Sequence, residues 1–210
     1  MASGLKQTLG KLAKEKAPGP NTSFSSFHFL LALELIAEQA LGRNKLAEKL
    51  GIGEGATRTL IGRLKDQDLI LVSKPGCSLT QKGLKLLSEY QSRIKKVSIE
   101  KNELTFSDHS FVVLVRNSAE EVKTGIEQRD AAVMAGAKGA TTMIMRHGHL
   151  IFPTFDRHVE KDFPRASSQI MQLLGPRESD TVIVVSSDTS SKAEHGVLAA
   201  AWTLLDCNWR

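Results

Sequence analysis

The chain has 210 residues, of which 41% are hydrophobic and 24% are charged. This composition is typical of soluble globular proteins, and the length suits one large domain or two small ones. The longest apolar run, residues 27–33, is too short to cross a bilayer, and no apolar segment at the N-terminus indicates a secretory signal. Cys77 and Cys207 lie far apart and lack the spacing of metal ligands. We expect a cytoplasmic protein without membrane segments.

The net charge of +5 is distributed unevenly along the chain. Residues 1–96 contain 16 Lys and Arg against 8 Asp and Glu, whereas residues 97–210 contain 12 against 15. A basic excess favours contact with nucleic acid phosphates, and an acidic excess disfavours it. The charge distribution therefore predicts two domains, of which only the N-terminal one suits nucleic acid.

The first segment, residues 1–20, carries Lys6, Lys11, Lys14 and Lys16 and ends in a Pro-Gly-Pro sequence that breaks helical structure. We expect a flexible arm whose lysines either lie in solvent or contact DNA phosphates. A helix capped by Ser25 or Ser26 is predicted to follow and to extend to Ala40, because its apolar residues recur at helical spacing.

Residues 44–65 have the pattern of two helices joined by a tight turn. The first helix ends at Leu50, and the sequence Gly51-Ile52-Gly53 supplies the turn. In the second helix, apolar residues share one face and leave the other small, polar and cationic. This outward face consists of Gly55, Arg58, Thr59, Gly62 and Arg63. Each exposed glycine costs about 1 kcal/mol of helix propensity, which indicates close approach to a partner such as the DNA major groove.

A basic hairpin and another helix complete this half of the chain. Residues 69–79 contain two short apolar runs around the turn Ser73-Lys74-Pro75-Gly76, and Thr80 caps a predicted helix over residues 81–96. The order of helix, turn, helix and hairpin is that of a winged helix-turn-helix domain. The segment LAEKLGIGEGATRTLIGRLKDQDLI, followed by LTQKGLKLL, resembles prokaryotic transcription regulators of the MarR and DtxR kinds. With PGPNTSFSSFHFL, it is most similar to archaeal regulators that carry a poorly characterised C-terminal domain.

The resemblance implies that residues 21–97 form a domain that binds double-stranded DNA, and that the chain forms a homodimer. In similar regulators, the helix after the wing contributes to the dimer interface. The predicted DNA-binding residues are Asn44, Lys45, Gly55, Arg58, Thr59, Gly62, Arg63 and Lys74. The alternative is that the winged helix binds protein or RNA. The basic residues 93–96 are either a phosphate contact or a charged helix end.

Residues 98–109 are polar and are predicted as a linker with one short strand at residues 103–106. The second domain, residues 110–210, alternates apolar runs with helical patterns in the order β-α-β-β-α-β-α. Strands are expected at 111–115, 141–145, 149–152 and 181–186, and helices at 119–134, 159–174 and 191–205. The chain is therefore predicted to be α+β, with a C-terminal two-layer α/β domain that resembles ferredoxin-like sensor modules. The strand order cannot be deduced from the sequence.

Three features of this domain bear on a site for an anionic small-molecule effector. One is the glycine-spaced turn over residues 136–142, which is a weak phosphate cradle because no P-loop or dinucleotide fingerprint surrounds it. Arg129 shares a helical stripe with Ile126 and Val133, and it either faces an anion, pairs with a carboxylate or reaches the edge of the core. The hydroxyl-rich residues 186–191 follow a predicted strand at the start of a helix, where anions bind, although an ordinary capped loop explains them equally well. The predicted ligand-binding residues are Arg129, Asp130, Thr141, Ser186, Ser187 and Asp188.

Metal and catalytic chemistry are less well supported. Five potential ligands lie close together in the sequence: His147, His149, Asp156, His158 and Glu160. However, His147-Gly148 suits a two-residue hairpin turn, and no histidine pair has helical ligand spacing. No metal site and no cofactor are predicted. The chain contains no GxSxG, HExxH or other recognised catalytic motif, so we expect no enzyme.

The sequence thus predicts a DNA-binding transcription regulator with a C-terminal ligand-sensing or dimerisation domain. One alternative is a winged helix fused to an enzymatic domain for small-molecule or nucleotide chemistry. Another is a metal-dependent repressor, because DtxR-like repressors sense metals.

Overall fold

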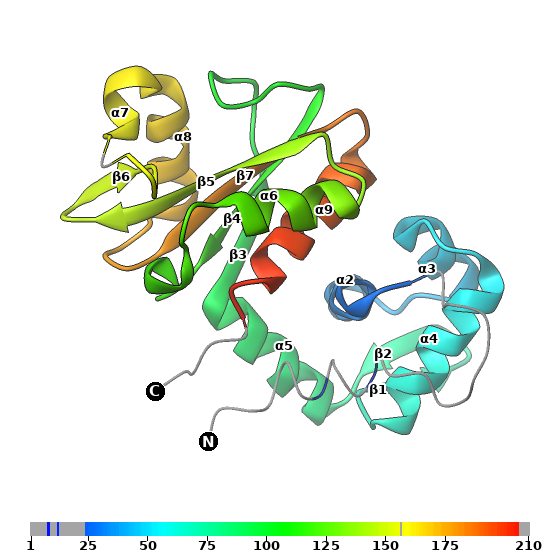
Figure 1. Ribbon diagram of the computed structural model, residues 1–210. Helices are drawn as coiled ribbons and strands as arrows, with labels where there is room; N and C mark the ends of the chain where they lie inside the picture. Colours follow the sequence, from blue (N-terminus) through cyan, green and yellow to red (C-terminus); the bar gives the residue numbers. More distant parts are fainter. Residues whose placement is uncertain (1–7, 9–11, 13–23, 156, 206–210) are drawn as a thin grey trace. The chain divides into compact units, whose positions relative to one another are not determined.

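The computed structural model describes residues 8, 12, 24–155 and 157–205, and the chain divides into two compact units (Figure 1). Apart from Thr8 and Leu12, the predicted arm lies outside the described residues, as do Asp156 and Cys207. Within the part of the chain that is described, no helix combines the length and apolarity needed to cross a membrane.

The N-terminal unit, Met1–Gln91, contains the predicted helices and hairpin. Its elements are α2 (Ser26–Glu38), α3 (Arg43–Leu50), α4 (Glu54–Asp66), β1 (Ile70–Ser73), β2 (Gly76–Leu79) and most of α5 (Gln81–Arg93). Ser25 is the N-cap of α2, and its N–H donates to His28 Nδ1 at 3.0 Å. Gly51 ends α3 in the left-handed conformation, with φ 66°, which glycine adopts without strain. This order of elements is that of a winged helix-turn-helix.

The hairpin β1–β2 is held against the chain between α2 and α3. Cys77 N–H donates to the Leu41 carbonyl at 2.8 Å, and Leu41 N–H donates back at 3.3 Å. Gly76 has φ +133°, and a Cβ at this position would come within 2.6 Å of the Leu41 carbonyl carbon. Position 76, next to the turn of the hairpin, therefore requires glycine both for its backbone angle and for this close approach.

The predicted helix over residues 81–96 is wrong at its C-terminal end, because α5 stops at Arg93 and β3 (Ile94–Ser98) begins at once. Ile94 pairs with Val115 in the sheet, and this cross-strand pairing replaces the helical hydrogen bonds. Lys96 forms a 2.6 Å ion pair with Glu194, and Lys95 Nζ donates to the Leu173 carbonyl. The residues between 99 and 108 contain no strand, so the short strand expected at 103–106 is also wrong.

The C-terminal unit, Ser92–Trp209, is built around a five-stranded antiparallel sheet of order β3-β4-β7-β5-β6. After β3, its elements are β4 (His109–Val115), the 3₁₀ turn η1 (Ala119–Glu121), α6 (Ile126–Met134), β5 (Gly139–Arg146), β6 (His149–Ile151), α7 (Val159–Asp162), α8 (Pro164–Leu174), β7 (Thr181–Ser187) and α9 (Ser190–Trp202). The α+β class is confirmed.

The sheet of this unit has helices on both faces, so the predicted two layers are three. Figure 1 shows α6 and α9 on one face and α7 and α8 on the other. Val112 and Val184 pack with Ile170 of α8, while Gly196 of α9 lies against Val185 on the opposite face. The physical reason is that β4 and β7 are continuous apolar runs rather than alternating ones, and such strands need cover on both faces.

The single helix predicted over residues 119–134 is divided in the structure. Residues 119–121 form η1, and α6 starts only at Ile126. Gly125 separates the two with φ 84°, and it lies so close to β5 that an added Cβ would come within 2.9 Å of Thr142 Cβ. The turn before α6 therefore presses directly against the sheet.

Candidate functional site

The exposed face of α4 carries three of the five predicted DNA-reading residues. Gly55, Arg58 and Thr59 are exposed, whereas Thr57, Leu60 and Leu64 are fully buried against the core of the N-terminal unit. A Cβ added at Gly55 or Gly62 would meet no atom within 4 Å. Packing among the described residues therefore does not require glycine at either position, although each glycine weakens the helix.

Arg63 differs from the other predicted reading residues because it is engaged inside the unit. Its Nη1 donates to the Leu12 carbonyl at 2.9 Å, and its guanidinium lies 5.3 Å from the centre of the Phe24 ring. The side chain is half-buried. This arrangement gives Arg63 a structural role at the edge of the α4 face.

The start of α3 and the tip of the wing add further exposed polar groups. Asn44 and Lys45 are exposed in the first turn of α3, and its N-cap, Gly42, has no side chain to accept from the first amides. Such amides suit a phosphate oxygen. Lys74 is exposed in the turn between β1 and β2, beside the exposed Val72.

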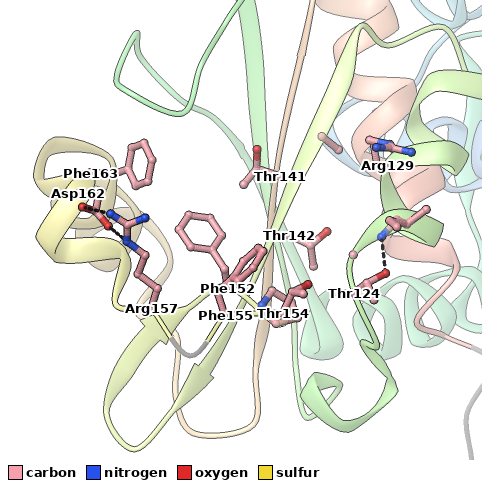
Figure 2. A pocket seen from close by; sticks show the side chains of 14 residues that line it. Thr124, Arg129, Thr141, Thr142, Phe152, Thr154, Phe155, Arg157, Asp162 and Phe163 are labelled. Carbon is pink, nitrogen blue, oxygen red and sulfur yellow. Dashed lines mark hydrogen bonds and ion pairs between the residues drawn. The ribbon is translucent and has the colours of Figure 1, made fainter.

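The C-terminal unit contains a cavity of about 580 Å³ at the edge of its sheet (Figure 2). It is lined by the start of α6, by residues 140–142 of β5 and by the loop between β6 and α7. Because β6 pairs only with residues 144–146 of β5, no strand among the described residues covers the outer edge of residues 139–143. The shortness of β6 therefore opens the cavity.

Polar backbone groups of β5 face this opening. Met145 N–H donates to the Asp180 carbonyl, on the β7 side of the strand. Backbone groups alternate in direction along an antiparallel strand, so those of Ala140 and Thr142 point toward the outer edge. The Thr142 hydroxyl is buried and has no hydrogen-bond partner within the described structure. The cavity thus offers the unpartnered Thr142 hydroxyl, beside the outward backbone groups of β5.

Aromatic and charged side chains surround these groups. The rings of Phe152 and Phe163 pack edge to face at 5.7 Å, and Phe155 is largely exposed. Arg157 pairs with Asp162 at 2.6 Å on one wall, and Arg129 on the other wall pairs with its neighbour Asp130 at 2.9 Å. Figure 2 shows Arg129 and Arg157 on opposite sides of β5. The cavity combines an apolar body with two cationic groups.

The predicted ligand-binding residues fall into two groups. Arg129 and Thr141 line the cavity, and Asp130 is the ion-pair partner of Arg129. The helical stripe that was expected to place Arg129 toward the core is exposed, since Ile126 and Val133 are each about half accessible.

The other three predicted ligand residues lie at the C-terminal end of β7, outside the cavity lining. Ser186 and Ser187 are fully buried, with hydroxyl contacts to Ser110 Oγ at 2.7 Å and the Gly136 carbonyl at 3.3 Å. Asp188 receives a hydrogen bond from Lys192 Nζ at 3.3 Å, and this contact lowers its pKa. Protein groups thus satisfy the polar atoms of this turn, as expected for a capped loop.

The sequence reading missed the aromatic wall and Arg157. Phe152, Phe155 and Arg157 lie between β6 and α7, Phe163 follows α7, and no spacing rule connects them to α6 or β5. The only sequence signal was the concentration of aromatic residues in FPTF and DF.

Comparisons with known proteins agree with the two-part organisation. Residues 29–85 match a family model described as the PH0730-like N-terminal domain, and residues 106–204 match a domain of unknown function, DUF4443. The hypothetical protein PH0730 from Pyrococcus horikoshii OT3 has a similar solved structure, with a TM-score of 0.68 and 28% identity over 84% of this chain and 91% of that chain.

One curated relative is named as a gene regulator. The central glycolytic genes regulator of Priestia megaterium is 42% identical over 60 residues, which are 29% of this chain and 18% of that protein. The match therefore covers less than a fifth of the regulator. Together, these similarities support a transcription-regulator family.

Proposed function

We propose that this chain is a DNA-binding transcription regulator that reads duplex DNA with the outward face of α4 and the wing. The observation that carries this proposal is that the outward face of α4 presents exposed Arg58 together with Gly55 and Gly62. Both glycines have room for a side chain. Each of these glycines costs about 1 kcal/mol of helix propensity relative to alanine, and the close approach of another surface would account for that cost. Arg58 supplies the donors that guanine accepts in the major groove, and Lys74 and the first turn of α3 supply phosphate contacts.

The direct test is duplex DNA affinity measured against salt concentration by fluorescence anisotropy. We expect the wild type to bind with a steep salt dependence, and Arg58→Ala to weaken binding about tenfold or more, corresponding to roughly 1–3 kcal/mol for a bidentate base contact. Lys101→Ala is the matched control, because it removes one exposed positive charge from the C-terminal unit.

Two outcomes would contradict the proposal at different levels. If the wild type does not bind duplex DNA, or binds it independently of salt, the proposed DNA-binding function is contradicted and the protein or RNA alternative is favoured. If Arg58→Ala and Lys101→Ala bind duplex DNA with equal affinity, the protein still binds DNA, but the assignment of the DNA-reading surface to α4 is contradicted.

We further propose that the sheet-edge cavity binds a small effector with an apolar or aromatic body and an anionic group. The support is the combination of Phe152, Phe155 and Phe163 with Arg129 and Arg157 around the unpartnered hydroxyl of Thr142. An anion would compete with Asp162 and Asp130 for the two guanidinium groups. Effector binding would act through unequal affinity for DNA-competent and DNA-incompetent states.

Thermal shift against a panel of aromatic carboxylates and sugar phosphates tests this effector site. A ligand of this class should raise the melting temperature of the wild type by mass action, and the shift should decrease in Arg157→Gln. Arg165→Gln is the control, because this exposed arginine on α8 is not part of the cavity lining. If no compound of this class stabilises the protein, or if both variants respond equally, the cavity assignment fails.

Regulators of this class often bind two half-sites as dimers, and we propose a homodimer here as well. The exposed apolar residues Ile126, Val133 and Met134 on α6 are available for such an interface. Sedimentation equilibrium of the full chain gives the mass directly, and a monomer at micromolar concentration would contradict the dimer.

A further inference from the structure

His149, His158 and Glu160 converge beside the β6–α7 loop, although they are separated in sequence by other residues. His149 Nδ1 lies 2.5 Å from Glu160 Oε1, and His158 Nδ1 lies 3.4 Å from the same oxygen. The two imidazole rings stack with centroids 4.2 Å apart and planes inclined by 28°. The three potential ligand atoms all lie within 4.8 Å of one another.

Backbone structure holds each of these side chains in place. His149 is the first residue of β6, and the backbone of His158 forms an antiparallel bridge with Ile151 of the same strand. Glu160 lies in the first turn of α7, directly after His158. The cluster therefore does not depend on long mobile segments, and a bound ion would find its ligands largely preassembled.

The neighbouring histidine has a different role. His147 and Gly148 both have positive φ, 53° and 78°, and they form the two central residues of the β5–β6 hairpin turn. Their N–H groups donate to the Glu178 carboxylate at 3.1 and 3.3 Å. His147 is therefore a turn residue, as the sequence predicts. His149 lies in β6, outside the turn, and its ring contacts Glu160.

We propose that His149, His158 and Glu160 bind one divalent transition-metal ion of the Zn²⁺ type. Two imidazole nitrogens and one carboxylate oxygen form a ligand set that zinc uses with a fourth, open position. Ligand atoms around tetrahedral zinc are about 3.3 Å apart, given metal–ligand distances of about 2.0–2.1 Å. The 3.4 Å separation of His158 and Glu160 already matches this geometry, and the 2.5 Å separation of His149 and Glu160 requires a small outward rotation of either side chain.

The location of the ion gives it a structural consequence. It would join β6 to α7 across the loop that carries Arg157 and two residues of the aromatic wall of the cavity, Phe152 and Phe155. Metal occupancy would therefore hold this wall in place. The proposal does not rest on DNA binding, and it is tested without DNA.

The first experiment titrates Zn²⁺ into the full chain, prepared without a histidine tag, by isothermal calorimetry. The wild type should bind one Zn²⁺ per chain, and His149→Ala, His158→Ala and Glu160→Gln should each weaken binding at least tenfold. His147→Asn and His109→Ala are matched controls and should bind as the wild type does, since Asn tolerates the left-handed backbone of residue 147. The three ligand side chains are between 34% and 49% exposed, so their replacement should leave the fold intact, which circular dichroism in EDTA checks.

A second measurement needs no variant. Co²⁺ bound at this site should show the intense visible absorption of four-coordinate cobalt, and added Zn²⁺ should abolish it. The proposal is overturned if the wild type binds no Zn²⁺ saturably, if the three substitutions leave affinity unchanged, if the control substitutions weaken it as much, or if bound Co²⁺ keeps the weak spectrum of the hydrated ion.

Discussion

The guanidinium of Arg63 donates a hydrogen bond to the backbone carbonyl of Leu12, 51 residues earlier in the chain, at 2.9 Å. Arg63 also lies over the Phe24 ring, so its side chain ties the segment before α2 to α4. Arg58, five residues earlier on the same helix, is exposed. The two arginines that share the predicted reading face therefore differ in what their removal should do.

We expect Arg63→Ala to lower the free energy of unfolding of the N-terminal unit by about 1–2 kcal/mol, through loss of a charged hydrogen bond and a cation–π contact. Arg58→Ala should change the same quantity by less than about 0.5 kcal/mol, as exposed substitutions usually do. Urea unfolding followed by circular dichroism measures both. Equal destabilisation by the two variants would contradict the structural role of Arg63.

Replacing the glycines of α4 with alanine should raise the stability of the protein while it lowers the affinity for duplex DNA. Gly55→Ala and Gly62→Ala should each stabilise the protein by about 0.5–1 kcal/mol, because alanine favours the helix and the new Cβ meets nothing within 4 Å. If α4 approaches DNA closely, the same substitutions should weaken duplex binding. Thermal melting and anisotropy on the same samples provide the two readings.

Gly83→Ala in α5 serves as the contrasting control for this pair. A Cβ at position 83 would lie 2.1 Å from the Leu69 carbonyl oxygen, so this substitution should destabilise the unit. Unchanged DNA affinity in stabilised Gly55→Ala and Gly62→Ala proteins would argue that the glycines do not face DNA.

Asp180 should be among the residues of the C-terminal unit whose truncation costs most. Its buried carboxylate accepts from Arg116 Nη1 at 2.5 Å and from the N–H groups of Arg177 and Asn117 at 2.8 and 3.0 Å. Asp180→Ala leaves these donors unpaired and should cost about 3 kcal/mol of unfolding free energy. Chemical denaturation measures the loss, and exposed Asp108→Ala should show almost none. A loss under about 1 kcal/mol would mean that water replaces the carboxylate without penalty.

The stability of the C-terminal unit should decrease in mild acid because of His195. Burial lowers the pKa of this imidazole below its ordinary value of 6.5, with Glu194 opposing the shift and Lys96 adding to it. The unfolded chain therefore takes up the proton more readily than the folded one. The unfolding free energy should be at its full value above pH 6.5 and should decrease as the pH falls below it.

Denaturant unfolding at a series of pH values tests this dependence. His195→Gln should flatten the decrease, whereas His109→Gln, at an exposed position, should not. An unchanged pH profile in His195→Gln would assign the acid sensitivity to other groups.

Much of the N-terminal unit was predictable because its signals are local. Helical spacing over residues 44–65, the glycines around Ile52 and the Pro75-Gly76 turn each act within a few residues, and the two helices and the hairpin that they predict are present. Continuous apolar runs likewise marked the central strands β4 and β7. The same locality explains an error, because the spacing of three between Ile94 and Val97 fits a helix, and only pairing with β4 makes this segment a strand.

Tertiary structure decided how the candidate sites of the C-terminal unit are assembled. The last strand, β7, inserts between β4 and β5, and this order leaves part of β5 at an edge that only the short β6 adjoins. The cavity and the His149–His158–Glu160 cluster form there from segments that no sequence period connects. Helical phase placed Arg58 and Arg63 on one face, whereas the packing of Leu12 and Phe24 made one of them structural and left the other exposed. Periodicity determines which side of a helix is polar, but long-range packing determines which of its polar side chains remain available to a partner.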